Sequence, residues 1–385
     1  MFEIDDAKGQ TAKIKVVGVG GAGGNAVNNM IASNLRGVEF IAVNTDTQVL
    51  ETSLAPVKVQ IGASITKGLG AGSNPEIGKQ SALEDRPSIA EVLEGADMVF
   101  ITAGMGGGTG TGASPVVAHV ARELGALTVA IVTKPFFYEA RTRAINAEEG
   151  IRELRNNVDT IIVIPNDRIA LVVDKNTPLL KGFSIANDVL KQAVQGISDI
   201  ILKPGLINVD FADVKTIMQN TGKAVMGTGT GKGEGGAAEA AKRAILNPLL
   251  EDSTIEGARG ILFNITGGIN LSLSDVQEAA SIIYDSAHEN ATIIIGNVID
   301  PDSDDEIRIT VIATGFEEKR EKVEMPQIKK WTPLSEPVSL KAAGRVLSKS
   351  LNPGIVLNTV SSDIMPYEDP LDVPTFMRKM PQREM

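Results

Sequence analysis

The stretch AGMGGGTGTGAS, residues 103–114, holds six glycines and two threonines directly after the apolar run ADMVFIT (96–102). A second glycine-rich stretch, VVGVGGAGGNAVNNM (16–30), also combines an apolar run with glycines. Glycine allows a backbone to approach a ligand closely. Neither stretch has the lysine spacing of a P-loop. We therefore expect phosphate to be bound by backbone amides, a helix N-terminus and the hydroxyls of Thr109 and Thr111.

The composition of the 385 residues excludes several classes of protein. With 37 Lys and Arg against 48 Asp and Glu, the net charge is −11, so unassisted binding to nucleic acid or anionic lipid is not expected. The absence of cysteine excludes disulfides and thiolate metal sites, and suits a reducing cytosol. The acidic start has no signal-peptide pattern, and no apolar run approaches the ~20 residues that span a bilayer. We expect a cytoplasmic protein without direct membrane insertion.

Short runs rich in valine and isoleucine alternate with helical patterns through the first half of the chain. They predict helices at 24–33, 114–124 and 146–157, and strands at 13–20, 38–46, 96–104, 127–135 and 158–167. Nearly continuous apolar strands that alternate with helices are typical of a doubly wound, mainly parallel α/β sheet. Ligands of such sheets bind at the carboxyl ends of the strands.

The sequence also predicts the domain organisation. One long helical pattern runs from about residue 178 to residue 203 and ends before Pro204 and Gly205. The second half has helical and strand patterns of a smaller α+β domain, followed by a charged, proline-punctuated region that predicts disorder. The predicted parts are a flexible N-terminus (1–10), a nucleotide-binding domain (11–178), a central helix (179–203), an α+β domain (204–316), a disordered linker (317–362) and a partner-binding tail (363–385).

The first glycine stretch alone permits a different interpretation. Gly18, Gly20 and Gly23 form G-x-G-x-x-G, and Asp46 ends the next strand, which is the pattern of a dinucleotide-binding oxidoreductase. A simple tight turn is the structural alternative. Neither interpretation gives a role to residues 103–114. A nucleoside triphosphate would use both stretches, and a third glycine-bearing loop, GLGAGSNP (68–75), could close over its terminal phosphate.

Residues 106–112, GGGTGTG, resemble the signature of the tubulin/FtsZ superfamily of GTPases. Further matching segments follow in the family's order: NTD (44–46), KPF (134–136), IPND (164–167), ANDVL (186–190), NVDFADV (208–214) and DPLDVPTFMRK (369–379). The resemblance implies a self-assembling GTPase of bacterial division, at mid-cell beneath the inner membrane. It implies GTP or GDP and Mg²⁺ as ligands, with K⁺ as a further candidate and the metal ligands unknown. The family usually reads KPFxFEG, whereas Tyr138 and Ala140 stand here.

The resemblance also implies a set of nucleotide contacts. It assigns guanine contacts to Asn166, Phe183 and Asn187, and ribose and phosphate contacts to Glu139 and Arg143. On pattern alone, Phe183 could equally be a core residue, Asn166 a turn residue and Arg143 part of a solvated face. The implied phosphate contacts are Gly20, Gly21, Ala22, Gly23, Gly24, Asn25, Gly104, Gly106, Gly107, Gly108, Thr109 and Gly110, with Ala71 and Gly72 at the γ-phosphate.

Two carboxylates, Asp210 and Asp213, follow the long helix. On pattern alone they are acids that cap the next helix and complement its dipole. A helix over 179–203 is about 37 Å long, so these acids lie too far from a nucleotide whose base sits at its start. They could serve only the nucleotide of the next subunit, in a head-to-tail contact. The resemblance implies the same, with Asn208 in the segment that completes the GTPase site in trans; carboxylates there would position a water.

The tail mixes apolar and charged residues, a composition that suits a segment folding onto a partner, although a frayed terminus is the alternative. The resemblance implies that it binds membrane-anchoring and regulatory division proteins. The candidate contact residues are Asp369, Leu371, Asp372, Val373, Pro374 and Phe376.

Overall fold

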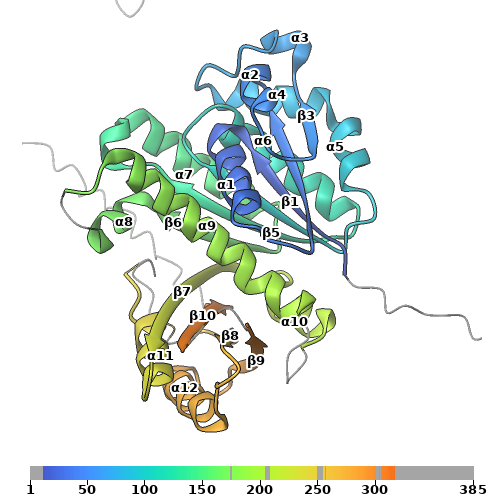
Figure 1. Cartoon of the computed structure of the whole chain (residues 1–385). Helices are drawn as coiled ribbons and strands as arrows, with labels where there is room; N and C mark the ends of the chain where they lie inside the picture. The colour runs from blue at the N-terminus through green and yellow to red at the C-terminus, as the bar shows by residue number, and fades with distance from the viewer. Residues whose placement is uncertain are drawn as a thin grey trace, which may run out of the picture. The chain divides into compact units, whose positions relative to one another are not determined.

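The computed structural model describes residues 12–316, apart from 174–175, 204–208, 249–254, 256, 301–302 and 304. Contacts divide the chain into two units, 1–319 and 320–385, and every described residue belongs to the first. The predicted linker and tail therefore lie outside the described residues. Figure 1 shows how strands and helices alternate in the first unit.

A parallel sheet forms the first part of this unit. Its strands are β1 (Ile14–Val19), β2 (Val38–Asn44), β3 (Val57–Gln60), β4 (Met98–Gly104), β5 (Leu127–Lys134) and β6 (Thr160–Pro165). They pair in parallel in the order β3-β2-β1-β4-β5-β6. The direction of winding reverses between β1 and β4, and ligands of open α/β sheets bind outside the carboxyl ends at such a point. Each glycine-rich stretch follows one of these two strands.

Helices cover both faces of this sheet, because successive strand side chains point to opposite sides. Val16 belongs to the core shared with α1 (Gly20–Ala32) and α9 (Leu179–Leu202). Val17 belongs to the core shared with α5 (Arg86–Leu93), α6 (Thr109–Glu123) and α7 (Arg141–Arg155). The prediction of a doubly wound sheet is therefore confirmed. The remaining elements of this part are α2 (Thr47–Glu51), α3 (Ala63–Thr66), α4 (Pro75–Glu84), the 3₁₀-helix η1 (Phe137–Glu139) and α8 (Asn166–Val172).

The second part continues the same sheet. It comprises α10 (Phe211–Met218), β7 (Gly222–Lys232), α11 (Gly236–Ile245), β8 (Gly260–Gly267), α12 (Leu273–Ser286), β9 (Thr292–Ile299) and β10 (Glu306–Thr314). β7 pairs in parallel with β6 at its start and antiparallel with β10, which joins β8 and then β9. The sheet thus has ten strands, and its second part has its own core between the strands, α11 and α12.

Strand β7 is not predicted from the sequence, because glycine in a strand interior weakens the strand pattern. Its glycines have a packing role. A Cβ atom on Gly227, Gly229 or Gly231 would lie 2.0–2.1 Å from a backbone oxygen atom of α11. Because these glycines have no side chains, α11 packs directly against the backbone of β7.

Helix α6 also differs from its prediction. The sequence predicts a helix from Ser114, but α6 begins at Thr109, inside the glycine-rich stretch. Half of that stretch is therefore a loop and half is the first turn of a helix. Among the helices that the structure describes, none is both long and apolar enough to span a membrane.

Candidate nucleotide-binding site

Two helix N-termini meet at the carboxyl ends of β1 and β4. Neither α1 nor α6 has a side chain that caps its N-terminus, and neither has an acidic residue in its first turn. The N–H groups of the first turns are left for another acceptor, and the helix dipoles favour an anion there. A Cβ atom on Gly20 would lie 2.8 Å from the backbone nitrogen of Gly110, so the two turns touch. Together they form a cradle suited to phosphate.

The glycines of this cradle are of two kinds. A Cβ atom on Gly23 would lie 2.3 Å from the carbonyl oxygen of Thr102, so this glycine is required by packing. Gly106 is required by its φ of +101° and by its contact with α7. By contrast, nothing lies within 4 Å of a Cβ atom on Gly21 or Gly107, and both line a cleft. These two face the space that phosphates would fill.

The cleft has a volume of about 580 Å³ and gathers residues from several strand ends and from the start of α9. Of the predicted site residues, it brings together Gly21, Ala22, Asn25, Gly104, Gly107, Gly108, Thr109, Gly110, Glu139, Arg143, Asn166, Phe183 and Asn187. Ala71 and Gly72 do not line it, although Gly70 and Ser73 beside them do. Gly20, Gly23, Gly24 and Gly106 do not line it.

The threonines differ in what their hydroxyls do. Thr109 lines the cleft, and its Oγ1 atom lies 2.7 Å from Oγ1 of Thr45. The carbonyl oxygen of Thr45 accepts a hydrogen bond from Thr66. The hydroxyl of Thr111 instead accepts the N–H of Gly106 at 2.8 Å and is buried. Thr111 therefore holds the loop in shape rather than facing the cleft.

Asn166, which lines the cleft, offers an unpaired acceptor. Its side chain is 6% exposed, and its Oδ1 atom has no hydrogen-bond partner among the described residues. A buried polar atom without a partner costs about 1–3 kcal/mol. A base that carries N–H donors, as guanine does, would satisfy this oxygen.

Phe183 of α9 also lines the cleft. Its ring packs edge-on against Phe136, with centroids 5.4 Å apart, and remains partly exposed. An exposed aromatic face in a cleft can stack on a base. Asn187, one turn further along α9, also lines the cleft.

Glu139 organises the loop after β5. Its Oε1 atom accepts the N–H of Phe136 at 2.9 Å, and its Oε2 atom accepts a hydrogen bond from Nη1 of Arg143 at 2.5 Å. Between them, Ala140 has φ +87° and ψ 147°, a conformation that is essentially restricted to glycine. The departure from KPFxFEG thus places a strained alanine in this loop.

Several cleft residues lie outside the predicted set, although their position just after a strand could have indicated them. Asp46 belongs to the dinucleotide interpretation, but its Oδ1 atom caps α2 by accepting the N–H groups of Gln48 and Val49. The added residues at the ends of β2 and β5 are Asn44, Asp46, Thr133 and Pro135.

The two predicted catalytic acids do not reach this cleft. Asp210 is the N-cap of α10 and accepts the N–H of Asp213 at 2.8 Å, as the capping interpretation expects. Both acids are exposed. Phe183 lies in the second turn of α9, a helix of 24 residues and about 36 Å, and the acids follow the far end of this helix. Asn208 lies outside the described residues.

No cluster of three or more histidine, cysteine or acidic side chains occurs among the residues that the structure describes. Those residues therefore do not form an all-protein metal cage.

Comparison with known proteins now identifies the family. Residues 13–174 match the GTPase domain of the Tubulin/FtsZ family, and residues 222–317 match the C-terminal domain of the FtsZ family. The chain is 57% identical over 322 residues to cell division protein FtsZ of Pseudomonas aeruginosa, covering 84% of this chain and 82% of that protein. The chain belongs to the FtsZ family. The FtsZ of Coxiella burnetii is 56% identical over 316 residues, 82% of each chain.

Solved structures agree with this membership. An FtsZ dimer of M. jannaschii superimposes with a TM-score of 0.77 at 44% identity, over 80% of this chain and 89% of that one. CetZ2 of Haloferax volcanii, at 21% identity and a TM-score of 0.69 over 80% and 94% of the two chains, shares the fold. The resemblance stated from the sequence is confirmed, and FtsZ-family membership makes the chain a GTPase rather than a dinucleotide oxidoreductase.

Proposed function

We propose that this FtsZ-family GTPase forms GTP-dependent filaments in bacterial cell division and hydrolyses GTP where two copies meet head to tail. The single observation that carries the shared site is the length of α9 between the cleft and the exposed acids. The division role is supported by the FtsZ relatives, which are named as cell division proteins. A head-to-tail contact that does not close on itself generates a filament.

The nucleotide occupies the cleft in this proposal. The first turns of α1 and α6 hold the phosphates, Arg143 adds positive charge, and the loop that contains Ala71 and Gly72 covers the γ-phosphate. Guanine lies against Phe183 and donates to Asn166. These roles are supported by the uncapped helix ends, the open space at Gly21 and Gly107, and the unpaired oxygen of Asn166.

The chemistry requires the acids of the neighbouring copy. Carboxylates repel a triphosphate, so Asp210 and Asp213 do not hold phosphates. They accept hydrogen bonds from the attacking water and orient it in line with the γ-phosphate, as positioning groups do in phosphoryl transfer. Bound Mg²⁺ would neutralise charge that develops on the phosphates.

Exposed apolar side chains around the cleft support a contact surface. Leu69, Phe137 and Leu180 are all more than three-quarters exposed, and the first two flank cleft residues. Ile269, after β8, and Leu273, the first residue of α12, are exposed as well.

The Asp213→Ala variant tests the catalytic assignment. We expect GTP affinity in an equilibrium titration to match the wild type, because the acid lies outside the cleft of its own chain. Phosphate release should fall about 100-fold or more, because the water loses its orienting group. A large loss of GTP affinity, or turnover at the wild-type rate, would contradict the assignment.

We further propose that the protein acts in the cytoplasm at the division site, and that its tail, residues 363–385, binds membrane-anchoring and regulatory division proteins. Deleting the tail should leave assembly and phosphate release unchanged and abolish co-sedimentation with a purified membrane-anchoring division protein. Undiminished co-sedimentation would overturn this role for the tail.

A further inference from the structure

Strand β7 has a long edge without a strand partner. It pairs with β6 only from Gly222 to Ala224, whereas it pairs with β10 from Val225 to Lys232, its last residue. From Val225 to Lys232, the edge opposite β10 therefore has no strand partner among the described residues. Such an edge is a template for pairing with another extended chain.

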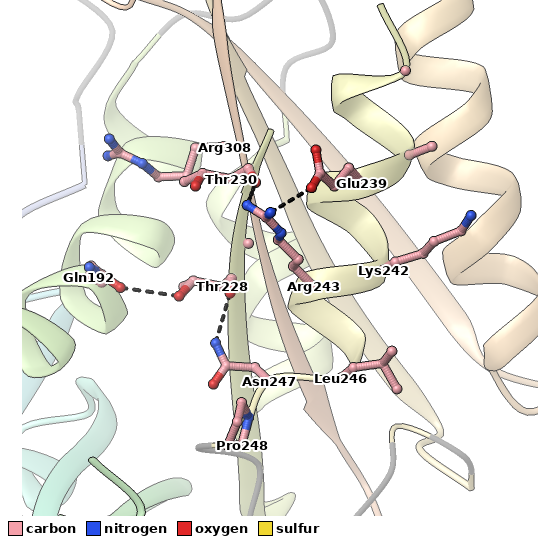
Figure 2. Close-up of a pocket in the computed structure, with 13 residues that line it drawn as sticks. Gln192, Thr228, Thr230, Glu239, Lys242, Arg243, Leu246, Asn247, Pro248 and Arg308 are labelled. Atoms are coloured by element: carbon pink, nitrogen blue, oxygen red, sulfur yellow. Dashed lines mark hydrogen bonds and ion pairs between the residues drawn. The ribbon is translucent and has the colours of Figure 1, made fainter. Parts of the chain in front are cut away.

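A groove of about 690 Å³ lies against this edge. Figure 2 shows Gln192 of α9 and Arg308 of β10 on one side of β7, and the side chains of α11 on the other. Thr228, Gly229 and Thr230 of β7 lie between them. The groove therefore reaches both faces of the sheet at its free edge, and it is separate from the nucleotide cleft.

Hydrogen bonds show which backbone groups face the groove. The carbonyl oxygen of Thr228 accepts from Nδ2 of Asn247 at 2.7 Å, and that of Thr230 accepts from Nη1 of Arg243 at 2.9 Å. These carbonyls point away from β10. In an antiparallel strand, the N–H and C=O groups of one residue point to the same edge. The N–H groups of Thr228 and Thr230 therefore also point away from β10. The free edge of β7 thus presents two N–H donors, whereas the carbonyl oxygens of the same two threonines already accept hydrogen bonds from side chains.

The side chains around the groove carry a positive charge, in contrast to the acidic chain as a whole. Arg243 pairs with Glu239 at 2.5 Å. Lys242 and Arg308 also line the groove, and neither forms an ion pair with any residue that the structure describes. An occupant with carboxylates would complement these two cations.

We propose that this groove binds an extended acidic segment of a partner protein, which adds a strand to β7 between α9 and α11. Backbone carbonyls of the segment accept the N–H groups of Thr228 and Thr230. Its carboxylates pair with Lys242 and Arg308, and its apolar side chains cover the exposed Leu246. Strand addition supplies affinity through the backbone, and the charges supply selectivity.

The probe is a fluorescein-labelled decapeptide of alternating aspartate and valine, added to the full-length protein and followed by anisotropy. We expect saturable binding that weakens at least about ten-fold when Lys242→Glu and Arg308→Glu are combined. Arg152→Glu, an exposed charge reversal on α7, is the matched control and should bind as the wild type does. The same peptide with lysine in place of aspartate should not bind.

Strand addition is distinguished from simple charge attraction by Thr230→Pro. Proline removes the N–H that faces the groove but leaves the bonds to β10, and edge strands tolerate it there. We expect unchanged circular dichroism and phosphate release, and loss of peptide binding. In the wild-type protein, the peptide should slow hydrogen exchange in β7, a readout that holds even if the proline variant does not fold. Absence of saturable binding, or binding without protection of β7, would overturn the proposal.

Discussion

At the scale of single residues, Ala140 shows how the site constrains the chain. Its positive φ lies where a Cβ atom is strained by about 1–3 kcal/mol. The backbone is held there by the bonds of Glu139 to Phe136 and Arg143. The hydrogen bonds that hold this loop, which carries Arg143 at the cleft, thus outweigh the preference of alanine for a negative φ.

Ala140→Gly should therefore stabilise the protein. The relieved strain exceeds the extra backbone entropy of glycine, about 0.5–1 kcal/mol, so we expect a net gain of about 1 kcal/mol and a rise in Tm of about 2 °C. Ala144→Gly, in the exposed part of α7, is the matched control and should lower stability by about 1 kcal/mol. Thermal unfolding without nucleotide measures both. Equal destabilisation by the two variants would show that Ala140 is not strained.

The residue scale also shows what a sequence can predict about a site. Glycine-rich stretches after apolar strands indicate where phosphates bind, because that rule depends on local order alone. The pattern does not separate Gly21, which faces the cleft, from Gly23, which packs on Thr102. That difference depends on contacts between segments about 80 residues apart in the chain.

At the scale of elements, α9 links the two halves of the proposed mechanism. Its first turns line the cleft with Phe183 and Asn187, and its end leads to the acids. Near that end, Asp199 is 7% exposed. Burial raises the pKa of its carboxyl above the ordinary value of 3.8, which the ion pair with Lys203 at 3.0 Å only partly opposes.

Asp199→Asn should make stability less sensitive to pH. Below pH 3.8 the aspartic acid is protonated in both states. As the pH rises, the unfolded chain loses this proton before the folded chain does, so the wild type loses stability up to the raised pKa. The asparagine variant lacks this loss. Its free energy of unfolding should therefore rise relative to that of the wild type between pH 4 and pH 7. Urea unfolding at several pH values measures the difference, and a constant offset would contradict the burial effect.

The elements also divide into predictable and unpredictable ones. Strands β1, β4 and β5 are predicted within about two residues, because each is a continuous apolar run. Strand β7 is not predicted, because its glycines serve contact with α11, a partner that follows it in the chain. Its free edge depends on strand order, which local pattern does not encode.

At the scale of the whole molecule, the cleft and the acids lie at opposite ends of a long helix. A single copy contains both halves of the proposed GTPase site but cannot bring them together. Hydrolysis would therefore depend on assembly, and a filament would carry complete sites only between its subunits. The sequence predicts this arrangement from the length of one helical pattern, together with the family resemblance that assigns the guanine contacts to the start of that helix.

The most direct measurement mixes two variants that are each inactive alone. Asp213→Ala retains a working cleft, and Gly107→Val fills the cleft, since the space beside Gly107 is open. In an equal mixture, the cleft of one variant can meet the acids of the other, and random pairing gives about a quarter of the wild-type number of complete sites. We predict that phosphate release in the mixture rises toward that level, far above the sum of the two variants. Release that stays at the sum would contradict a site shared between subunits.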